Sequence, residues 1–103
     1  MEQTYPMRIV TYKRIAEFIE EHSDSKIALQ DWYYKTTKAI WENASDIKKT
    51  FNHVDFVGDC RVVFNVKGNQ FRLVAIVIFA SKKVYIRFIG THTEYDKIDC
   101  ATI

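Results

Sequence analysis

Apolar residues recur with a helical period in the first half of the chain. Across residues 13–22 they return every three or four positions, and charged residues fill the positions between them. This pattern is typical of an amphipathic helix. A second helix is predicted over residues 26–42, with cap residues offered by Ser23, Asp24 and Ser25. The residues expected on its buried side are Leu29, Trp32, Tyr33, Thr36, Ile40 and Trp41.

A shorter helix and a short apolar segment complete this half. Ser45 is the predicted N-cap of a third helix that runs through Phe51. Asp46 falls in the first turn of that helix, where the helix dipole stabilises an acid. Residues 8–11 fit either an opening strand or the lead into the first helix, and the pattern does not decide between them.

Past the third helix the pattern changes to that of strands. Residues 60–90, CRVVFNVKGNQFRLVAIVIFASKKVYIRFIG, predict three strands joined by tight turns at residues 67–69 and 80–83. The first turn reads Lys-Gly-Asn, and both Gly and Asn tolerate a positive φ. Residues 71–79 are apolar on both alternations, as in a central strand that is covered on both faces. Helices followed by antiparallel strands predict an α+β fold, with the N-terminal helices packed on a small, mainly antiparallel sheet.

Length and composition predict one domain. Residues 1–103 contain no repeat or linker, and an apolar content of 48% is enough for a single core. No apolar run reaches the roughly 18 residues of a membrane helix, and the N-terminus does not read as a secretory signal. We therefore expect a cytoplasmic protein, in which Cys60 and Cys100 are free thiols. Their spacing suits no zinc site.

Positive charge gathers in the second half of the chain. The net charge of the whole chain is only +2. Residues 60–103 contribute seven Lys or Arg against three Asp or Glu, whereas residues 1–59 contribute eight against ten. The predicted sheet is therefore the basic part of the chain, and it favours an anionic partner.

Two arginines stand in otherwise apolar strands. Arg72 lies in the second predicted strand and Arg87 in the third. A guanidinium is always charged and is rarely buried alone, so each arginine requires an anion or a strand end that is open to water. An internal partner such as Glu94 or Asp96 meets this requirement as well as a phosphate does. The occurrence of both arginines on one basic sheet favours the phosphate.

Polar residues follow the last predicted strand directly, in the stretch GTHTEYDKI. His92 is able to exchange a proton near neutral pH. Tyr95 can donate a hydrogen bond or stack on a base, and Lys97 can stabilise negative charge on a phosphate. Each of these residues, taken singly, also fits an ordinary surface position. His22 is assigned no function, and His53 has no predicted place relative to the sheet.

Most enzyme motifs are absent from the sequence. There is no G-x-S-x-G, no Gly-rich phosphate loop and no H-E-x-x-H. What remains is a basic sheet with arginines, a histidine and a tyrosine. This set is sufficient to cleave RNA without a metal or a cofactor, because the 2′-hydroxyl of RNA can act as the nucleophile. The protein then supplies only proton transfer and charge stabilisation.

The sequence also resembles a known family. F-N-V-x-G-N at residues 64–69, Arg72, Y-I-R at residues 85–87 and T-H-x-E-Y-D at residues 91–96 are similar to motifs of the HigB toxins of enteric bacteria. These toxins belong to the RelE-like group of toxin–antitoxin ribonucleases. The segment MRIVTYKRIAEF resembles the start of these toxins, which makes residues 1–6 an N-terminal extension.

The resemblance implies a RelE-like α+β toxin that cleaves mRNA in the ribosomal decoding site and so inhibits translation. It implies attack by the 2′-hydroxyl without a metal or other cofactor. It also implies a cognate helix-turn-helix antitoxin. The toxin would be held at operator DNA only through that antitoxin. The chain lacks the lysine-rich helix that some relatives use, so the resemblance does not extend to the ribosome contacts of that helix.

The resemblance further implies roles for individual residues. Arg72 and Arg87 would hold the scissile phosphate. His92 and Tyr95 would transfer protons or stack on a base, and the roles of base and acid are not assigned separately. Asp96 would orient a neighbouring side chain. The residues expected to contact RNA beside the catalytic set are Lys97, Asp96, Arg61 and Lys67.

Two other functions fit the same residues. A non-catalytic RNA- or protein-binding module would use the same basic face, and it would bind RNA with a steep salt dependence while leaving the RNA intact. A degenerate toxin would bind an antitoxin and be harmless. Cleavage of cellular messages separates an active toxin from both alternatives.

Overall fold

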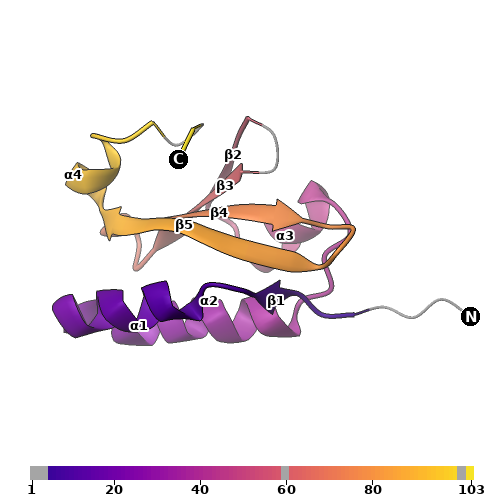
Figure 1. Ribbon diagram of the computed structural model, residues 1–103, viewed down its shortest axis with the longest axis horizontal. Helices are drawn as coiled ribbons and strands as arrows, with labels where there is room; N and C mark the ends of the chain where they lie inside the picture. Colours follow the sequence, from indigo (N-terminus) through magenta and orange to yellow (C-terminus); the bar gives the residue numbers. More distant parts are fainter. Residues whose placement is uncertain (1–4, 59–60, 100–101) are drawn as a thin grey trace, which may run out of the picture.

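The chain forms a five-stranded sheet with two long helices on one face and the C-terminal segment on the other (Figure 1). The computed structural model describes residues 5–58, 61–99 and 102–103. The elements, in chain order, are β1 (Arg8–Ile9), α1 (Tyr12–Glu21), a 3₁₀ turn (Ser23–Ser25), α2 (Lys26–Lys38), α3 (Ala44–Thr50), β2 (Val54–Val57), β3 (Arg61–Val66), β4 (Phe71–Ile78), β5 (Lys83–Thr91) and α4 (His92–Tyr95).

The sheet confirms the predicted α+β class. Its strand order is β1-β5-β4-β3-β2, in which β1 runs parallel to β5 and every other pair is antiparallel. The sequence predicts β3, β4 and β5. The structure adds β1, which decides between the two interpretations of residues 8–11, and β2, which has only four residues. A strand of that length is too short to show a clear alternation.

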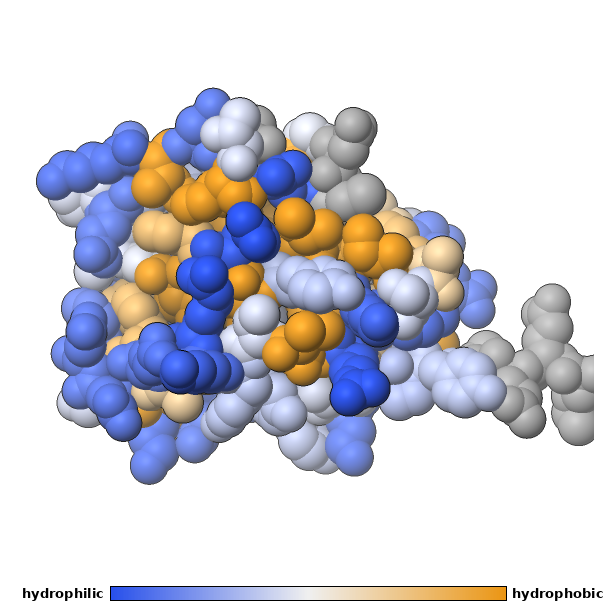
Figure 2. Space-filling model, viewed as in Figure 1, coloured by the Kyte–Doolittle hydropathy of each residue, from blue (hydrophilic) through white to orange (hydrophobic). Residues whose placement is uncertain are grey.

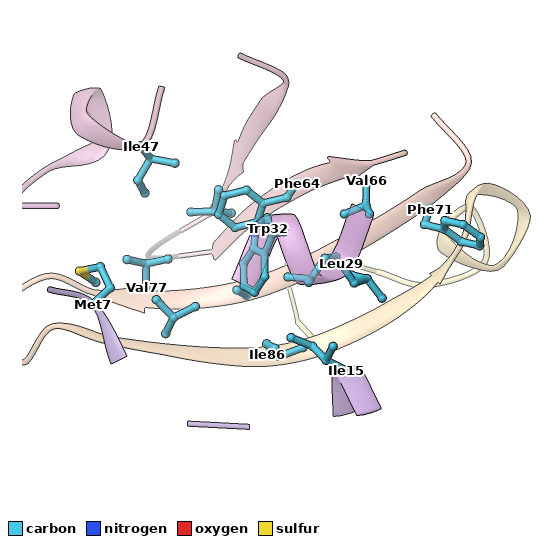
Figure 3. Packing of buried hydrophobic residues seen from close by; sticks show 14 of the residues in the cluster. Met7, Ile15, Leu29, Trp32, Ile47, Phe64, Val66, Phe71, Val77 and Ile86 are labelled. Carbon is cyan, nitrogen blue, oxygen red and sulfur yellow. The ribbon is translucent and has the colours of Figure 1, made fainter. Parts of the chain in front are cut away.

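The main core lies between α1, α2 and one face of the sheet (Figure 3). Ile15 of α1 and Leu29 of α2 are completely buried. Trp32 packs edge-on against Phe64 of β3, with ring centroids 5.3 Å apart. The odd-numbered residues of β4 belong to this core. Because side chains alternate along a strand, the even-numbered residues of β4 face the opposite side, and Arg72 is one of them.

The second helix is shorter than the sequence predicts. α2 ends at Lys38 because Ala39 adopts an extended backbone with ψ 146°. Ile40 is therefore 46% exposed rather than buried. Trp41 is buried, but it enters the core from the loop, and its indole Nε1 donates a hydrogen bond to Thr50 Oγ1 at 2.9 Å. The remaining predictions for the buried side hold, since Leu29, Trp32 and Thr36 are buried and Tyr33 is partly buried.

The caps of α2 and α3 also differ from the prediction. Ser25 Oγ donates to the carbonyl oxygen of His22 at 2.6 Å, and the Ser25 side chain does not cap α2. The N-cap of α3 is Asn43, whose Oδ1 accepts a hydrogen bond from the backbone N–H of Asp46 at 3.1 Å. Ser45 already lies inside the helix. The predicted place of Asp46 in the first turn is confirmed.

Both predicted hairpin turns are present. In the β3–β4 turn Lys67 and Gly68 have φ values of 53° and 65°, and in the β4–β5 turn Lys82 has a φ of 57°. Lys67, rather than Asn69, thus takes the left-handed conformation beside the glycine. The turns keep β3, β4 and β5 in one continuous antiparallel ladder.

A β-bulge interrupts that ladder at Arg87. Val74 of β4 pairs with Phe88 and Ala75 pairs with Ile86, so Arg87 is the extra residue on β5. On a regular strand, residues three apart face opposite sides of the sheet. Here Ile86 belongs to the main core and Ile89, three residues later, packs against the same core. Bulges bend a strand and redirect side chains, and they are common beside active sites.

Some predictions fall partly outside the described residues. Cys60 and Cys100 lie there, so their expected free thiols remain a prediction, as does the expected extension at residues 1–6. Of that extension Tyr5 and Pro6 are described as exposed, and Met7, which is 2% exposed, is the first described core residue. No helix in the described ranges is long and apolar enough to cross a membrane.

Candidate active site

The stretch GTHTEYDKI leaves β5 and turns at once into the one-turn helix α4. Thr91 is the N-cap, and it forms a reciprocal capping box with Glu94. The backbone N–H of Thr91 donates to Glu94 Oε1 at 2.8 Å, and the N–H of Glu94 donates to Thr91 Oγ1 at 3.2 Å. The N–H of His92 donates to the carbonyl oxygen of Gln70 at 3.1 Å, which ties α4 to the β3–β4 turn. These three hydrogen bonds fix where His92 and Tyr95 stand.

A close approach of the backbone supports the same arrangement. Gly90 is buried and pairs with Arg72 across the β4–β5 ladder. A Cβ atom at Gly90 would lie 2.4 Å from Phe88 Cζ and 3.2 Å from Glu94 Cβ. Because Gly90 has no side chain, the ring of Phe88 and the first turn of α4 can pack directly against its backbone.

The predicted catalytic residues come together in part. Arg72 Cζ lies 5.6 Å from the ring centroid of Tyr95, within the range of a cation–π contact. His92 Nδ1 lies 3.2 Å from Asp96 Oδ2, and both side chains are at least half exposed. Arg87 is exposed on β5, three residues before Gly90, which is about 10 Å at the usual rise per strand residue.

The internal carboxylates are engaged elsewhere. Glu94 accepts from Thr91, and Asp96 lies against His92. Within the described residues neither Arg72 nor Arg87 forms an ion pair with a carboxylate. The backbone oxygen of Arg87 accepts from Arg14 Nη1 at 3.3 Å, which leaves the Arg87 guanidinium unaffected.

Glu94 is held in its charged form. The hydrogen bond from the Thr91 backbone N–H lowers the pKa of this carboxyl below its ordinary value, against a smaller opposite effect of burial. The Thr91 hydroxyl and the positive charges of His22 and Lys97 lower the pKa further. Glu94 is therefore a carboxylate at neutral pH, and it acts as an acceptor that anchors α4.

The other predicted RNA contacts are more varied. Lys97 is exposed directly after α4. Arg61 Nε and Nη2 both donate to the main-chain oxygen of Ile103, at 3.1 and 2.9 Å, so this arginine anchors the end of the described chain over the sheet. Lys67 Nζ lies 3.5 Å from Asp24 Oδ2. The charges of Arg61 and Lys67 are thus partly satisfied within the protein, and their contact with RNA remains a prediction.

Two residues in the same row across the sheet as Arg72 were not assigned from the sequence. Asn65 pairs with Arg72 across the β3–β4 ladder, and its side-chain Oδ1 is buried without a hydrogen-bond partner in the described ranges. The backbone N–H of Asn65 donates to the carbonyl oxygen of His53 at 3.2 Å, which places His53 in the same row across the sheet. Asn65 lies in the F-N-V-x-G-N motif, but only the strand register reveals that it neighbours Arg72.

No group of three or more His, Cys, Asp or Glu residues in the described ranges is arranged to hold a metal ion. The side chains that do converge are an arginine with a tyrosine and a histidine with an aspartate. Together they offer cationic hydrogen-bond donors and groups that can transfer a proton. This chemistry suits a phosphodiester.

Comparison with known proteins assigns the family. Residues 25–98 match the profile of the HigB toxins, described as the RelE-like toxic component of a toxin–antitoxin system. The chain belongs to the HigB toxin family. It is 35% identical over 92 residues to the mRNA interferase toxin HigB of Escherichia coli strain K12, covering 87% of this chain and 88% of the relative. It is 23% identical over 94 residues to an mRNA interferase HigB of Escherichia coli O6:H1, covering 89% and 91%.

Membership of the HigB family confirms the resemblance drawn from the sequence motifs. A toxin of this family implies a cognate antitoxin. The matched segment includes every residue predicted for the site, from Arg61 to Lys97. It leaves out β1 and α1, which complete the sheet edge and the core.

Proposed function

We propose that this HigB-family toxin is an mRNA interferase that cleaves messages on the ribosome in the cytoplasm and so inhibits translation. A helix-turn-helix antitoxin would neutralise it and would hold it at operator DNA. The observation that carries the proposal is the contact between Arg72 and Tyr95, beside His92 and Asp96, within the segment that matches the family. This is an exposed cationic site with proton-transfer groups.

The reaction that fits the site is attack by a ribose 2′-hydroxyl on the adjacent phosphate. The hydroxyl loses its proton as its oxygen bonds to phosphorus. The bond from phosphorus to the 5′-oxygen breaks, and that oxygen takes up a proton, which leaves a 2′,3′-cyclic phosphate. Arg72 and Arg87 would stabilise the charge that develops on the phosphate oxygens. Loss of one such donor costs roughly 10²–10³-fold in rate.

His92 and Tyr95 are the proposed proton-transfer groups. Because Asp96 lies against Nδ1 of His92, Nε2 is the nitrogen that would exchange a proton with the RNA. Tyr95 lies beside the Arg72 guanidinium, so its hydroxyl would act near the same phosphate or its ring would support a base. General acid or base catalysis contributes roughly 10²–10⁴-fold.

The test is primer-extension mapping of cellular mRNA after brief induction. Wild-type protein should arrest growth and produce cuts within translated regions. His92→Ala and Arg87→Ala should abolish both effects. Thr93→Ala is the matched control, because Thr93 is an exposed neighbour in α4 that should leave cleavage intact. Thermal unfolding of each purified variant checks that its fold is preserved.

The outcomes separate the candidate functions. Cuts that are lost in His92→Ala but kept in Thr93→Ala support the proposed site. Full toxicity of His92→Ala and Arg87→Ala would overturn the residue assignment. Intact messages with the wild-type protein, together with salt-dependent RNA binding, would favour a non-catalytic binding module instead.

A further inference from the structure

Two cations stand side by side at the β1–β5 edge of the sheet. Arg8 of β1 pairs directly with Lys83 of β5, and the backbone N–H of Arg8 donates to the Lys82 carbonyl oxygen at 2.8 Å. Residues that pair across strands project to the same face, where like charges repel one another. Within the described ranges neither Arg8 nor Lys83 forms an ion pair. The pair is therefore a concentrated positive charge that lacks a carboxylate partner there.

The same two residues line a surface hollow of about 250 Å³, together with Ile9, Val10 and Tyr85. Among the residues that the structure describes, no carboxylate lines this hollow. A second hollow, between α1 and β5, has both Glu17 and Glu21 in its wall, and a third, near the start of α2, has two aspartates. A fourth hollow, lined by Arg61 with Phe56 and Phe79, also has no acid in its described wall, but its arginine already donates to the main-chain oxygen of Ile103.

The strand register connects this hollow to the proposed catalytic site. Lys83 pairs with Ile78 and Tyr85 pairs with Ile76, both even-numbered residues of β4. They therefore lie on the face that carries Arg72, away from the helices. Arg87 follows Tyr85 by two residues, about 7 Å along β5. Figure 2 looks onto this edge, where hydrophilic side chains run across the middle of the surface between apolar patches.

We propose that this hollow binds a nucleotide of the single-stranded RNA that flanks the cleaved phosphodiester. Arg8 and Lys83 would contact its phosphate, and the ring of Tyr85 would stack on its base. Such a site would bind any base, because every base presents a π face to an aromatic ring. The inference rests on the proposed function, because the cleavage site sets the path of the RNA strand. The hollow itself is defined by its own residues.

The first experiment measures binding of a short, fluorescently labelled RNA whose 2′-hydroxyls are all methylated, so that it cannot be cut. A plot of log affinity against log salt has a negative slope. In Arg8→Gln/Lys83→Gln that slope should become less steep, by about 0.7 for each phosphate that the protein no longer neutralises. The control Lys48→Gln/Lys49→Gln removes the same charge from α3 and should leave the slope unchanged.

The stacking contact is tested separately. Tyr85→Leu should weaken binding roughly 5- to 150-fold, which corresponds to the usual contribution of one stacked base. It should leave the salt slope unchanged. Tyr85→Phe keeps the ring and should bind like the wild type, so it shows whether a weaker affinity of Tyr85→Leu reflects stacking or a general defect of the fold.

Cleavage in a translating extract separates this inference from the proposed function. If the wild type cuts mRNA and all of the variants match it in both affinity and KM, the hollow is not a subsite. If the wild type binds the oligonucleotide through the hollow but cuts nothing, the hollow stands and the proposed function fails. If the wild type neither binds nor cuts, both fail. If the variants bind the oligonucleotide like the wild type but no longer bind vacant ribosomes, the hollow contacts ribosomal RNA and the proposal is wrong.

Discussion

Glu94→Ala should slow the proposed nuclease without unfolding it. Glu94 does not itself need to touch RNA for this to occur. Its carboxylate accepts the backbone N–H of Thr91, and its own N–H donates to the Thr91 hydroxyl. The substitution removes the first of these hydrogen bonds and weakens the second, so His92 and Tyr95 lose the support that places them over the sheet.

The expected magnitude follows from how little else holds α4. The helix has four residues and none of them is buried. Loss of the N-cap Thr91 itself would cost about 0.5–2 kcal/mol, and loss of Glu94, its partner in the capping box, should fall within that range. About 1.4 kcal/mol corresponds to a tenfold change in an equilibrium constant. We therefore expect the ratio of ordered to disordered α4 to fall roughly tenfold. Global unfolding should change little, because the main core lies on the other face of the sheet.

The assay combines cleavage rate in a translating extract with amide exchange along α4. Glu94→Ala should lower the rate and increase exchange at His92 and Tyr95 together. Glu94→Gln keeps an oxygen that accepts the Thr91 N–H, so it should retain most of the activity. Wild-type cleavage and exchange in Glu94→Ala would show that the capping box does not hold the site in place. Equal defects in both variants would assign the effect to charge rather than to the capping box.

The dependence on pH gives an independent check of the same carboxyl. The folded structure lowers the pKa of Glu94, so its stabilisation of α4 is fully present above the ordinary value of 4.5. That stabilisation is lost as the pH falls through the lower pKa of the folded protein. Amide protection of α4 should therefore decrease on acidification, and Glu94→Gln should remove that part of the decrease. A decrease of the same size in both proteins would contradict the assignment.

Two further pairs of substitutions test how the fold is held. Asn43→Ala should destabilise the protein by about 1 kcal/mol in urea unfolding through loss of the α3 cap, whereas Ser45→Ala should have little effect; the reverse order would show that the cap is misassigned. Gly90→Ala should cost about 1–3 kcal/mol because the new methyl group meets the ring of Phe88, and Phe88→Leu should restore most of that stability. Unchanged stability of Gly90→Ala would show that the ring moves aside freely.

The sequence predicts the elements whose pattern is long and regular. The apolar pattern of β3, β4 and β5 is sustained over six to nine residues, and these strands are found where they were expected. β2 is too short to show a recognisable pattern, and the parallel pairing of β1 depends on a partner more than 70 residues away. The end of α2 is fixed by the backbone of Ala39, which no periodicity of apolar residues reveals.

The candidate site follows the same division. The motif places His92 and Tyr95 in one segment, and the arginines stand out because a charge is unusual in an apolar strand. The neighbours of Arg72 could not be predicted, because pairing with Asn65 and Gly90 depends on strand register. The engagement of Arg61 by Ile103 could not be predicted either, since the return of the chain over the sheet leaves no local pattern.

β1 and β5 are partners that a ribosome makes far apart in time. The hydroxyl of Thr11, next to β1, bonds the backbone of Ile86, 75 residues later. At about 5–20 residues per second, roughly 4–15 s of synthesis separate the two. Every proposed catalytic residue lies in β4 or beyond it. A nascent chain therefore cannot pair β1 into the sheet or assemble the proposed catalytic site until β5 has been made, so any activity is confined to a nearly finished chain.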